Sequence, residues 1–308
     1  MLKIQKNIKL ADCTTFKIGG PARFFAEIDN EEDLIEALKY AQDNNLNFFI
    51  LGGGSNILVS DKGFDGIIIK IINSKFKILD SGLECDAGVS LCQIVSESAN
   101  NGLAGLEWAA GIPGTIGGAI RGNARAFGKC MGAVIESVKA FDADTLKIIG
   151  YNNKECEFTY WGSIFKKNSN LIILSAKIKS KKGDREKIQQ EIKNIISKRM
   201  AMQPREISPG SFFLNPVVTS EKLRKEFEME KNTKCKGGKI PAGWLIEEAG
   251  FKGKKIGGAM VSKKHANFII NTGNATAEDV IILAGLIKQQ VRDKLGVELQ
   301  EEVQFIGF

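Results

Sequence analysis

Hydrophobic residues recur at helical spacing in three parts of the chain, and a capping-box pattern begins a fourth predicted helix. These patterns predict helices over 31–44, from Ser90 to about Asn100, over 184–200, and from Thr276 to about Gly296. Asn30 and Thr276 are good N-caps, and an acidic residue follows each of them three positions later. The side chains expected on the buried faces of the first and third helices are Leu34, Ile35, Leu38 and Ala41, and Ile188, Ile192, Ile195 and Ile196.

Shorter apolar runs predict strands between these helices. Such runs occupy 47–51, 67–72, 133–141 and 171–179. The last residues alternate instead, which places Val297, Leu299, Val303 and Phe305 on one face and polar residues on the other. Two prolines and a glycine break the chain after residue 201, so a separate domain is expected from there to the end.

Two glycine-rich loops carry the strongest chemical signal. The loop LGGGSN at 51–56 follows a predicted strand directly, and EWAAGIPGTIGG at 107–118 combines glycines with an Ile-Pro-Gly-Thr turn. Glycine permits a positive φ and lets a ligand reach the backbone without meeting a Cβ. Consecutive backbone N–H groups in such loops form concave sites for anions. Two of them suggest one long diphosphate cofactor held between two lobes.

The common nucleotide-binding motifs are absent from both loops. A Walker A loop needs a lysine after its last glycine, and neither loop has one. The spacing of Gly111, Gly114, Gly117 and Gly118 also differs from the Gly-x-Gly-x-x-Gly dinucleotide fingerprint.

Composition narrows the classes further. The 308 residues are 43% hydrophobic and 26% charged, as in soluble globular proteins. The net charge of +7 favours anionic ligands, but no basic stripe with aromatics predicts nucleic-acid binding. Neither a membrane span nor a signal peptide is expected, which points to the cytoplasm. Six cysteines without a Cys-x-x-Cys pair and the single His265 predict reduced thiols and no metal site.

Seven blocks of the chain, in order, resemble the UDP-N-acetylenolpyruvoylglucosamine reductase family, in the short form that lacks an extra substrate-capping insertion. They are TTFKIGGPA (14–22), LGGGSNILV (51–59), EWAAGIPGTIGGA (107–119), GSFFLNP (210–216), KIPAGWLIEEAGFKG (239–253), KKHANFIIN (263–271) and ELQEEVQFIG (298–307).

The resemblance implies an α+β protein with a two-lobe FAD-binding fold of the vanillyl-alcohol-oxidase type and an α/β substrate-binding domain. The expected divisions are 1–72 for the first FAD lobe, 73–200 for the second lobe with a connecting helix, and 201–308 for the substrate domain. FAD is expected to be non-covalent, because neither loop has a neighbouring His or Cys in the sequence. The implied FAD-binding residues are Gly52, Gly53, Gly54, Ser55, Asn56, Gly111, Ile112, Pro113, Gly114, Thr115, Gly117, Gly118 and Asn123.

The resemblance also implies the reaction and its residues. NADPH reduces FAD and leaves, the UDP-sugar takes its place, and hydride passes through flavin N5 to the enol carbon. Ser211 matches the family's proton donor, and Glu302 matches the acidic group at the substrate carboxyl. Asn215 and Arg199 match substrate-site residues. A monomer that binds a UDP-sugar, for peptidoglycan precursor synthesis, is expected.

Four positions depart from the family pattern. Trp161 stands where the family has an arginine that contacts the substrate carboxylate, and indole cannot replace a bidentate guanidinium. Met202 and Leu214 replace lysines, and Arg125 replaces a glycine. One alternative is therefore an impaired FAD- or nucleotide-sugar-binding relative; another is an oxidoreductase with a different substrate. A third is a rearranged carboxylate clamp that uses Arg199, Arg205 or Arg125.

Overall fold

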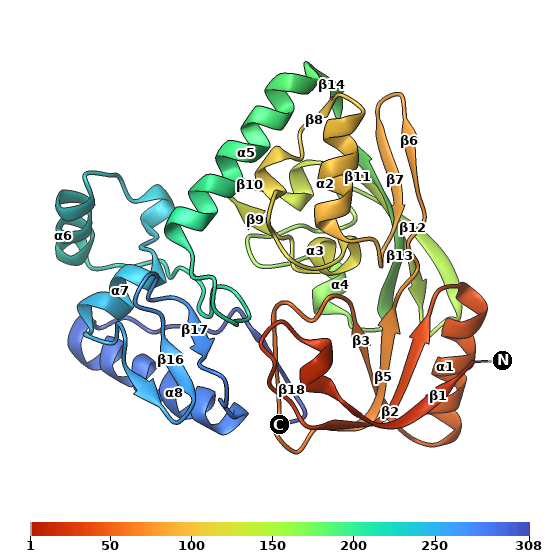
Figure 1. Cartoon of the computed structure of the whole chain (residues 1–308), viewed down its shortest axis with the longest axis horizontal. Helices are drawn as coiled ribbons and strands as arrows, with labels where there is room; N and C mark the ends of the chain where they lie inside the picture. The colour runs from red at the N-terminus through yellow and green to blue at the C-terminus, as the bar shows by residue number, and fades with distance from the viewer. Residues whose placement is uncertain (1) are drawn as a thin grey trace. The chain divides into compact units, whose positions relative to one another are not determined.

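The computed structural model describes residues 2–308 and divides them into two compact units (Figure 1). Unit 1 comprises the residues up to Ile8, Ala22–Gly54 and Asp65–Ala201. Unit 2 comprises Lys9–Pro21, Ser55–Phe64 and Met202–Phe308. The C-terminal unit thus takes in two short pieces of the N-terminal half. The division of the N-terminal part into lobes at residue 72 stays a prediction.

The first sheet of unit 1 has the strand order β1-β2-β5-β3. Its strands are β1 (Ile4–Lys9), β2 (Pro21–Ile28), β5 (Phe64–Ile71) and β3 (Asn47–Leu51), and β3 runs parallel to β5. Helix α1 (Glu31–Asp43) lies in the connection from β2 to β3. The helix contacts β3, the strand that enters the first glycine loop, and its Leu34 and Leu38 belong to the same buried core cluster as Ile67 and Ile69 of β5.

Helix α1 confirms the predicted cap and corrects one predicted core position. The Asn30 side chain accepts a hydrogen bond from the Asp33 N–H at 2.8 Å, which satisfies one of the unpaired donors of the first turn. Ile35 was expected in the core but is 38% exposed, whereas Ala37 is buried. Leu34, Leu38 and Ala41 are buried as expected, so the buried stripe extends toward Ala37 instead of Ile35.

The second sheet of unit 1 is antiparallel, with the order β12-β11-β13-β7-β6. Its strands are β12 (Lys147–Asn152), β11 (Ile135–Asp142), β13 (Leu171–Lys179), β7 (Gly82–Asp86) and β6 (Phe76–Leu79). The other helices of this part of the chain are α2 (Leu91–Asn100), α3 (Ile116–Arg121), α4 (Ile164–Lys167) and α5 (Arg185–Met202). It also contains two small strand pairs: β8 (Leu103–Ala104) with β14 (Lys181–Lys182), and β9 (Arg125–Ala126) with β10 (Lys129–Cys130).

Helix α5 buries less of its predicted face than expected. Ile188 and Ile195 are buried and Ile192 is half-buried, but Ile196 is 39% exposed. The buried positions lie seven residues apart on one narrow line, so the helix touches the core along a seam rather than a broad face.

Unit 2 is built around helix α8 (Ala277–Leu295), which contacts β15 (Lys255–Ile256) and β16 (Ala259–Val261) of a sheet completed by β17 (Ile269–Asn271) (Figure 1). The predicted capping box between Thr276 and Asp279 is present. Asp61 adds a second cap, because its carboxylate accepts the N–H groups of Ala277 and Glu278 at 2.9 and 3.2 Å. The other elements of the unit are α6 (Glu221–Lys231), α7 (Ala242–Glu248), β4 (Ile57–Val59) and β18 (Gln304–Ile306). Short 3-10 turns occupy Leu10–Cys13 in unit 2, Glu107–Ala109 and Met131–Ala133 in unit 1, and Lys236–Gly238 in unit 2.

The alternating C-terminal run forms less strand than its pattern predicts. Only Gln304–Ile306 forms a strand, β18, which pairs in parallel with β4. Val297, Leu299 and Val303 are buried as expected, but Phe305 is 41% exposed. Parallel pairing with a strand about 250 residues away in sequence (Gln304 opposite Ile57) fixes β18, and local alternation carries no information on it.

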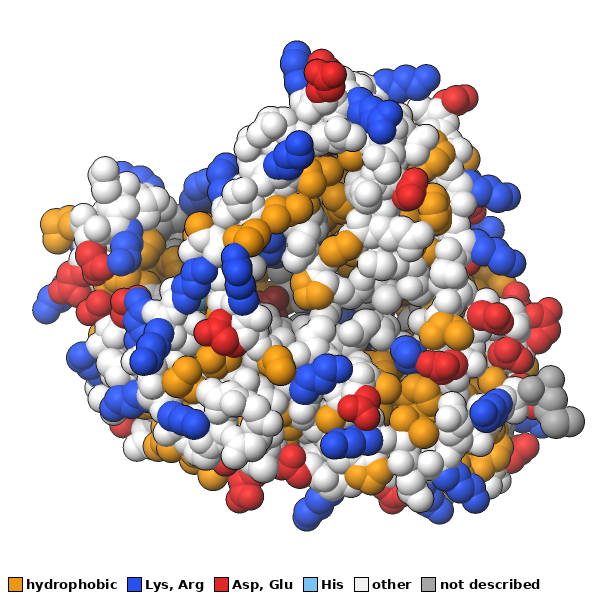
Figure 2. Space-filling model, viewed as in Figure 1, with side chains coloured by type: hydrophobic (Ala, Val, Ile, Leu, Met, Phe, Trp, Pro, Cys, Tyr) orange, Lys and Arg blue, Asp and Glu red, His pale blue; other side chains and the backbone are white. Residues whose placement is uncertain are grey.

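No helix within residues 2–308 has the length and apolar character that a bilayer span needs. On the face in Figure 2, lysine and arginine side chains are scattered among acidic ones and do not line up as a stripe.

Candidate active site

The two glycine loops meet in unit 1. A Cβ added to Gly53 would lie 2.7 Å from Gly114 Cα, and one added to Gly52 would lie 2.6 Å from Thr115 Oγ1. Gly111 and Gly114 also have positive φ values of 75° and 117°, a region that favours glycine. In residues 52–54 and 111–115, the glycine cradle, main chain therefore faces main chain at Gly53 and Gly114, and the Thr115 hydroxyl borders Gly52. Such a surface fits a diphosphate that must approach main-chain N–H groups.

Two of the expected cofactor glycines have roles within the protein. The Gly117 N–H donates to the Ala87 carbonyl at 2.8 Å, and a Cβ on Gly117 would lie 2.9 Å from Ala87 Cβ. The Gly118 N–H lies 3.4 Å from Thr115 Oγ1, which caps the short helix α3. Packing against Ala87 accounts for the glycine at 117, whereas the cap needs only a backbone N–H at 118, and the part of both residues in binding FAD stays a prediction.

Asn123 ties two loops together. It is 3% exposed and has a φ of 47°. Its Nδ2 donates to the Thr159 carbonyl at 2.7 Å, and its Oδ1 accepts the Gly132 N–H at 2.8 Å. The amide thus fixes the β9–β10 hairpin against the turn at 159–162.

That turn holds Trp161, the residue in place of the family arginine. Thr159 and Gly162 pair across it, with the Thr159 N–H donating to the Gly162 carbonyl at 2.8 Å. Trp161 packs edge-on against Tyr160, with ring centroids 4.4 Å apart. The Arg125 guanidinium lies 3.8 Å from the centroid of the Tyr160 ring, within the range of a cation–π contact. The Lys166 ammonium donates to the Trp161 carbonyl at 3.0 Å, so two cations border the turn.

Arg199 and Cys92 lie at the second glycine loop. A Cβ on Gly111 would lie 3.2 Å from Arg199 Cδ, and the Arg199 guanidinium is 5.3 Å from the Phe127 ring. Burial lowers the pKa of Arg199 from its ordinary value. The exposed Cys92 thiol lies 3.3 Å from the Ile112 carbonyl, a contact between α2 and the loop that sequence spacing did not reveal. The role of Arg199 in substrate binding stays a prediction.

The end of the first glycine loop belongs to unit 2. Ser55 and Asn56 lie in its second segment, and Asn56 Nδ2 donates to the Glu302 carbonyl at 3.3 Å. The Asn56 carbonyl accepts the Gln304 N–H at 3.0 Å. Asn56 therefore holds the backbone that carries Glu302, in addition to its expected place at the cofactor.

Ser211 lies in an irregular segment, residues 207–215, which we call the Ser211 segment. Gly210 precedes the serine with a φ of 88°, and Ser211 is half-buried. The next carbonyl, that of Phe212, accepts the Glu302 N–H at 2.8 Å. The structure thus places the backbones of the two expected catalytic residues side by side within one unit.

The neighbouring Glu301 makes two contacts within unit 2. Its carboxylate forms an ion pair with Lys288 at 2.9 Å, and its backbone pairs with Phe213. A residue engaged in this way has a structural role in unit 2. The assignment of Glu302 as the acidic group at the substrate stays a prediction.

Asn215 caps a helix. Its Oδ1 accepts the Ala242 N–H at 2.8 Å, at the start of α7. The N-cap position of α7 is Pro241, whose side chain cannot accept this bond. The Asn215 side chain therefore joins the end of the Ser211 segment to α7, and its contact with substrate stays a prediction.

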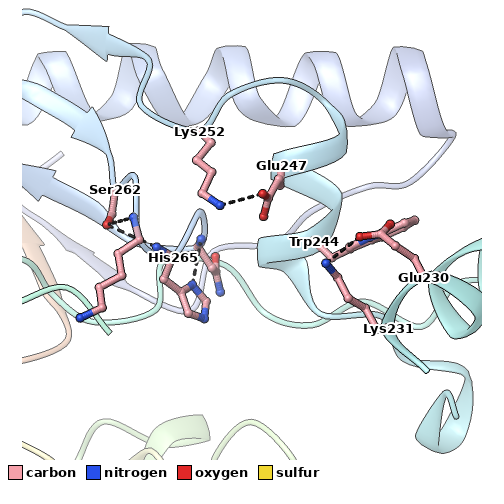
Figure 3. A network of polar contacts seen from close by, with 9 residues as sticks. Glu230, Lys231, Trp244, Glu247, Lys252, Ser262 and His265 are labelled. Atoms are coloured by element: carbon pink, nitrogen blue, oxygen red, sulfur yellow. Dashed lines mark hydrogen bonds and ion pairs between the residues drawn. The ribbon is translucent and has the colours of Figure 1, made fainter. Parts of the chain in front are cut away.

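The single histidine lies in the turn between β16 and β17 (Figure 3). His265 Nδ1 accepts the Asn267 N–H at 3.2 Å, and Ser262 Oγ accepts the N–H groups of Lys264 and His265 at 3.1 and 3.4 Å. Burial is the main cause of a lowered His265 pKa, with Glu247 opposing it and Lys252 adding to it. A neutral ring keeps Nδ1 as an acceptor.

We expect the free energy of unfolding to decrease as the pH falls below about 6.5, the ordinary pKa of histidine. The unfolded chain binds the proton more readily than the buried ring does, so this contribution is present above 6.5 and lost as pH falls through the lowered folded pKa. Because the chain has one histidine, NMR of a histidine-labelled sample gives its midpoint directly. His265→Asn should flatten the pH dependence below about 6.5. A midpoint above 6.5 would contradict this expectation.

Comparison with known proteins supports the sequence resemblance. Residues 22–146 match an FAD-binding domain family, and 203–306 match the C-terminal domain of UDP-N-acetylenolpyruvoylglucosamine reductase. The reductases of Carboxydothermus hydrogenoformans and Caldanaerobacter subterraneus are 40% and 38% identical to this chain, covering 99% of it and 94% of each relative.

A crystal structure of the Thermus caldophilus UDP-N-acetylenolpyruvylglucosamine reductase gives the same result in three dimensions. It has a TM-score of 0.79 at 30% identity and covers 99% of this chain and all of that one. The expected α+β fold, with an FAD-binding part followed by a C-terminal domain, is confirmed. The chain belongs to the UDP-N-acetylenolpyruvoylglucosamine reductase family of FAD-dependent oxidoreductases.

Proposed function

We propose that this protein reduces the enolpyruvyl ether of UDP-N-acetylglucosamine to the lactyl ether of UDP-N-acetylmuramate, with NADPH as reductant. The reaction adds one hydride and one proton across a carbon–carbon double bond and releases NADP⁺. FAD, when bound, supplies a two-electron carrier between nicotinamide and substrate. The proposal places the protein as a cytoplasmic monomer in peptidoglycan precursor synthesis.

The hydrogen bond between the Phe212 carbonyl and the Glu302 N–H is the observation that carries the proposal. It places Phe212, the residue directly after Ser211, beside Glu302, and the second half-reaction needs a hydroxyl and an acidic group such as these two residues supply. In our proposal, Ser211 donates a proton to the carbon beside the substrate carboxylate. A serine hydroxyl is a weak acid, so nearby donors and positive charge must stabilise transient alkoxide character. Glu302 would stabilise the developing charge on the carboxylate by sharing a proton with it.

The glycine cradle fits the diphosphate of FAD. The close approach at Gly53 and the positive φ values of Gly111 and Gly114 leave main chain as the facing surface. Arg199 packs on Gly111 of the same cradle, which supports a role for this cation beside a bound anion. We propose that residues 52–54 and 111–115 hold the cofactor and that Arg199 adds positive charge there.

A mass-spectrometric test of the function follows the product. Incubation with NADPH and the UDP-enolpyruvyl sugar should give a product with two more hydrogen atoms than the substrate. In deuterated water, one deuterium should enter at the carbon beside the carboxylate. Recovery of unchanged substrate from FAD-loaded protein would reject the proposed activity.

We further propose that Arg125 replaces the missing arginine of the carboxylate clamp. Of the three candidate arginines, it is the one whose guanidinium lies against the turn that carries Trp161, 3.8 Å from the centroid of the Tyr160 ring. Stacking on Tyr160 fixes the guanidinium plane while its edge stays available for a carboxylate. Arg205 is exposed, and Arg199 packs on the glycine cradle.

Replacing Arg125 with alanine should therefore lower kcat/KM for the enolpyruvyl substrate at least tenfold. A charge-assisted hydrogen bond is worth about 1.5–3 kcal/mol, and about 1.4 kcal/mol corresponds to a factor of ten. Trp161→Arg should give no gain, because a cation is already present. Steady-state kinetics with varied UDP-enolpyruvyl sugar measure both changes.

Arg23→Ala is the matched control for Arg125→Ala. Arg23 is also an arginine of unit 1 near an aromatic ring, 5.4 Å from the Phe24 centroid. Its replacement by alanine should leave kcat/KM unchanged. A rise in catalytic efficiency in Trp161→Arg, with no loss in Arg125→Ala, would instead identify an uncompensated clamp.

A second candidate function is a relative that binds FAD and the UDP-sugar without turnover. The observation that favours it is Trp161, since an indole carries no charge for a carboxylate. Such a protein would be reduced by NADPH and would bind the UDP-sugar, but the sugar would not reoxidise its flavin.

A further inference from the structure

Asn267 is a buried amide that contacts the Ser211 segment three times. It follows His265 in the turn between β16 and β17 and is 4% exposed. Its Oδ1 accepts the Phe213 N–H at 2.9 Å, and its Nδ2 donates to the Phe213 carbonyl at 2.8 Å. Its own carbonyl accepts the Phe212 N–H at 2.7 Å. One residue therefore fixes the two residues that follow Ser211.

On the side of the Ser211 segment that faces Asn267, these bonds take the place of a partner strand. The side-chain amide pairs with both backbone groups of Phe213, as a residue on a neighbouring strand would do. Phe212 and Phe213 are 0% and 1% exposed, so water cannot substitute for the amide. Loss of such a partner leaves buried donors and acceptors unsatisfied, which is costly.

The same segment is held from its other side by the chain that carries Glu302. The Phe212 carbonyl accepts the Glu302 N–H, and the Leu214 N–H donates to the Gln300 carbonyl at 2.9 Å. The Phe212 peptide groups are thus bonded to Asn267 on one side and to Glu302 on the other. A shift of Asn267 would move Ser211 relative to Glu302.

Asn267 is itself fixed by its turn. Its backbone N–H donates to His265 Nδ1, and Ser262 Oγ accepts the His265 N–H (Figure 3). The Phe268 N–H donates to the His265 carbonyl at 3.0 Å, and the Ser262 N–H donates to the Phe268 carbonyl at 2.8 Å. The turn is closed by its own hydrogen bonds and gives the amide a rigid base.

We propose that Asn267 is a positioning residue for proton transfer, which holds the Ser211 hydroxyl in register with Glu302. The inference rests on the proposed role of Ser211 as proton donor. Positioning contributes strongly to rate, and a displacement of about 1 Å costs on the order of 100-fold. The amide touches neither reacting group and acts through the backbone of Phe212 and Phe213.

The test compares the two half-reactions in Asn267→Leu and in the milder Asn267→Ser by stopped-flow absorbance of the flavin. Reduction of FAD by NADPH should keep the wild-type rate in both variants. Reoxidation at saturating UDP-enolpyruvyl sugar should slow by about 10- to 100-fold in Asn267→Leu and by less in Asn267→Ser. The solvent deuterium isotope effect on reoxidation should rise, because protonation becomes the slow step.

Asn271→Leu is the matched control. Asn271 is a second buried asparagine of unit 2, 7% exposed, whose side chain donates to the Phe16 carbonyl and accepts the N–H groups of Gly273 and Ala275. It should lower thermal stability by a similar amount while leaving the ratio of the two half-reaction rates and the isotope effect unchanged.

Two outcomes would overturn the inference: wild-type reoxidation in a folded, FAD-loaded Asn267→Ser, or equal slowing of both half-reactions in that variant. Ser211→Ala, measured in parallel, separates the two proposals. If Ser211→Ala reoxidises at the wild-type rate, the proton-donor role fails, and the inference about Asn267 fails with it. If Ser211→Ala is slow and the Asn267 variants are not, only the inference fails.

Discussion

Ser211→Ala is expected to abolish most of the second half-reaction and to spare the first. NADPH should reduce FAD at the wild-type rate, because arrival of hydride at the cofactor needs no serine. Reoxidation by the UDP-enolpyruvyl sugar should slow by about 10²- to 10⁴-fold, the usual contribution of a positioned general acid. Anaerobic stopped-flow absorbance of the flavin measures the two rates separately.

Ser208→Ala is the control for this change. Ser208 lies in the same segment, and its Oγ makes only a long contact, 3.5 Å, with the Gly210 N–H. It should leave both half-reactions within about twofold of wild type, as expected for a surface-type substitution. Equal slowing of the two half-reactions in Ser211→Ala would assign the serine a structural role.

Gly53→Ala is expected to weaken FAD binding strongly. The added Cβ would lie 2.7 Å from Gly114 Cα, and backbone cannot move aside as a flexible side chain can. Overpacking of this kind costs about 1–3 kcal/mol, which corresponds to roughly 5- to 150-fold in affinity if the strain falls on the cofactor-bound state. Titration of apoprotein with FAD, followed by flavin fluorescence, measures the dissociation constant.

Gly150→Ala is the control, since its Cβ would meet nothing within 4 Å and the residue lies on β12 of the same unit. It should bind FAD like the wild type. Acid precipitation of the wild-type protein should release its FAD, as expected for non-covalent binding. Normal FAD affinity in a folded Gly53→Ala would mean that the glycine cradle does not hold the cofactor.

Local signals in the sequence predicted local structure well. Asn30 and Thr276 start helices because their side chains accept backbone N–H groups three residues later, a contact that depends on neighbours alone. The strand 47–51 was predicted from its own short apolar run, which leads directly into a glycine loop. The two glycine loops were expected to bind one cofactor, which stays a prediction; their direct contact at Gly53 and Gly114 is a finding of the structure.

Contacts between distant residues were beyond the sequence. The choice between Ile35 and Ala37 for the core depends on how α1 lies on its sheet. The pairing of β18 with β4 and the bonds of Asn267 to Phe213 join segments far apart in the chain. The family resemblance implies a substrate-site role for Asn215. Its bond to the start of α7 depends on where Pro241 and Ala242 lie in the fold, which the sequence does not give.

The central claim, that this chain is an active reductase, is tested most directly by one stopped-flow experiment. Purified FAD-loaded protein is reduced with one equivalent of NADPH under anaerobic conditions and then mixed with the UDP-enolpyruvyl sugar. We expect the absorbance of oxidised flavin to return fully, with one UDP-N-acetylmuramate formed for each flavin reoxidised. A flavin that NADPH reduces but the UDP-enolpyruvyl sugar leaves reduced would contradict the account and identify a binding relative that lost the reaction.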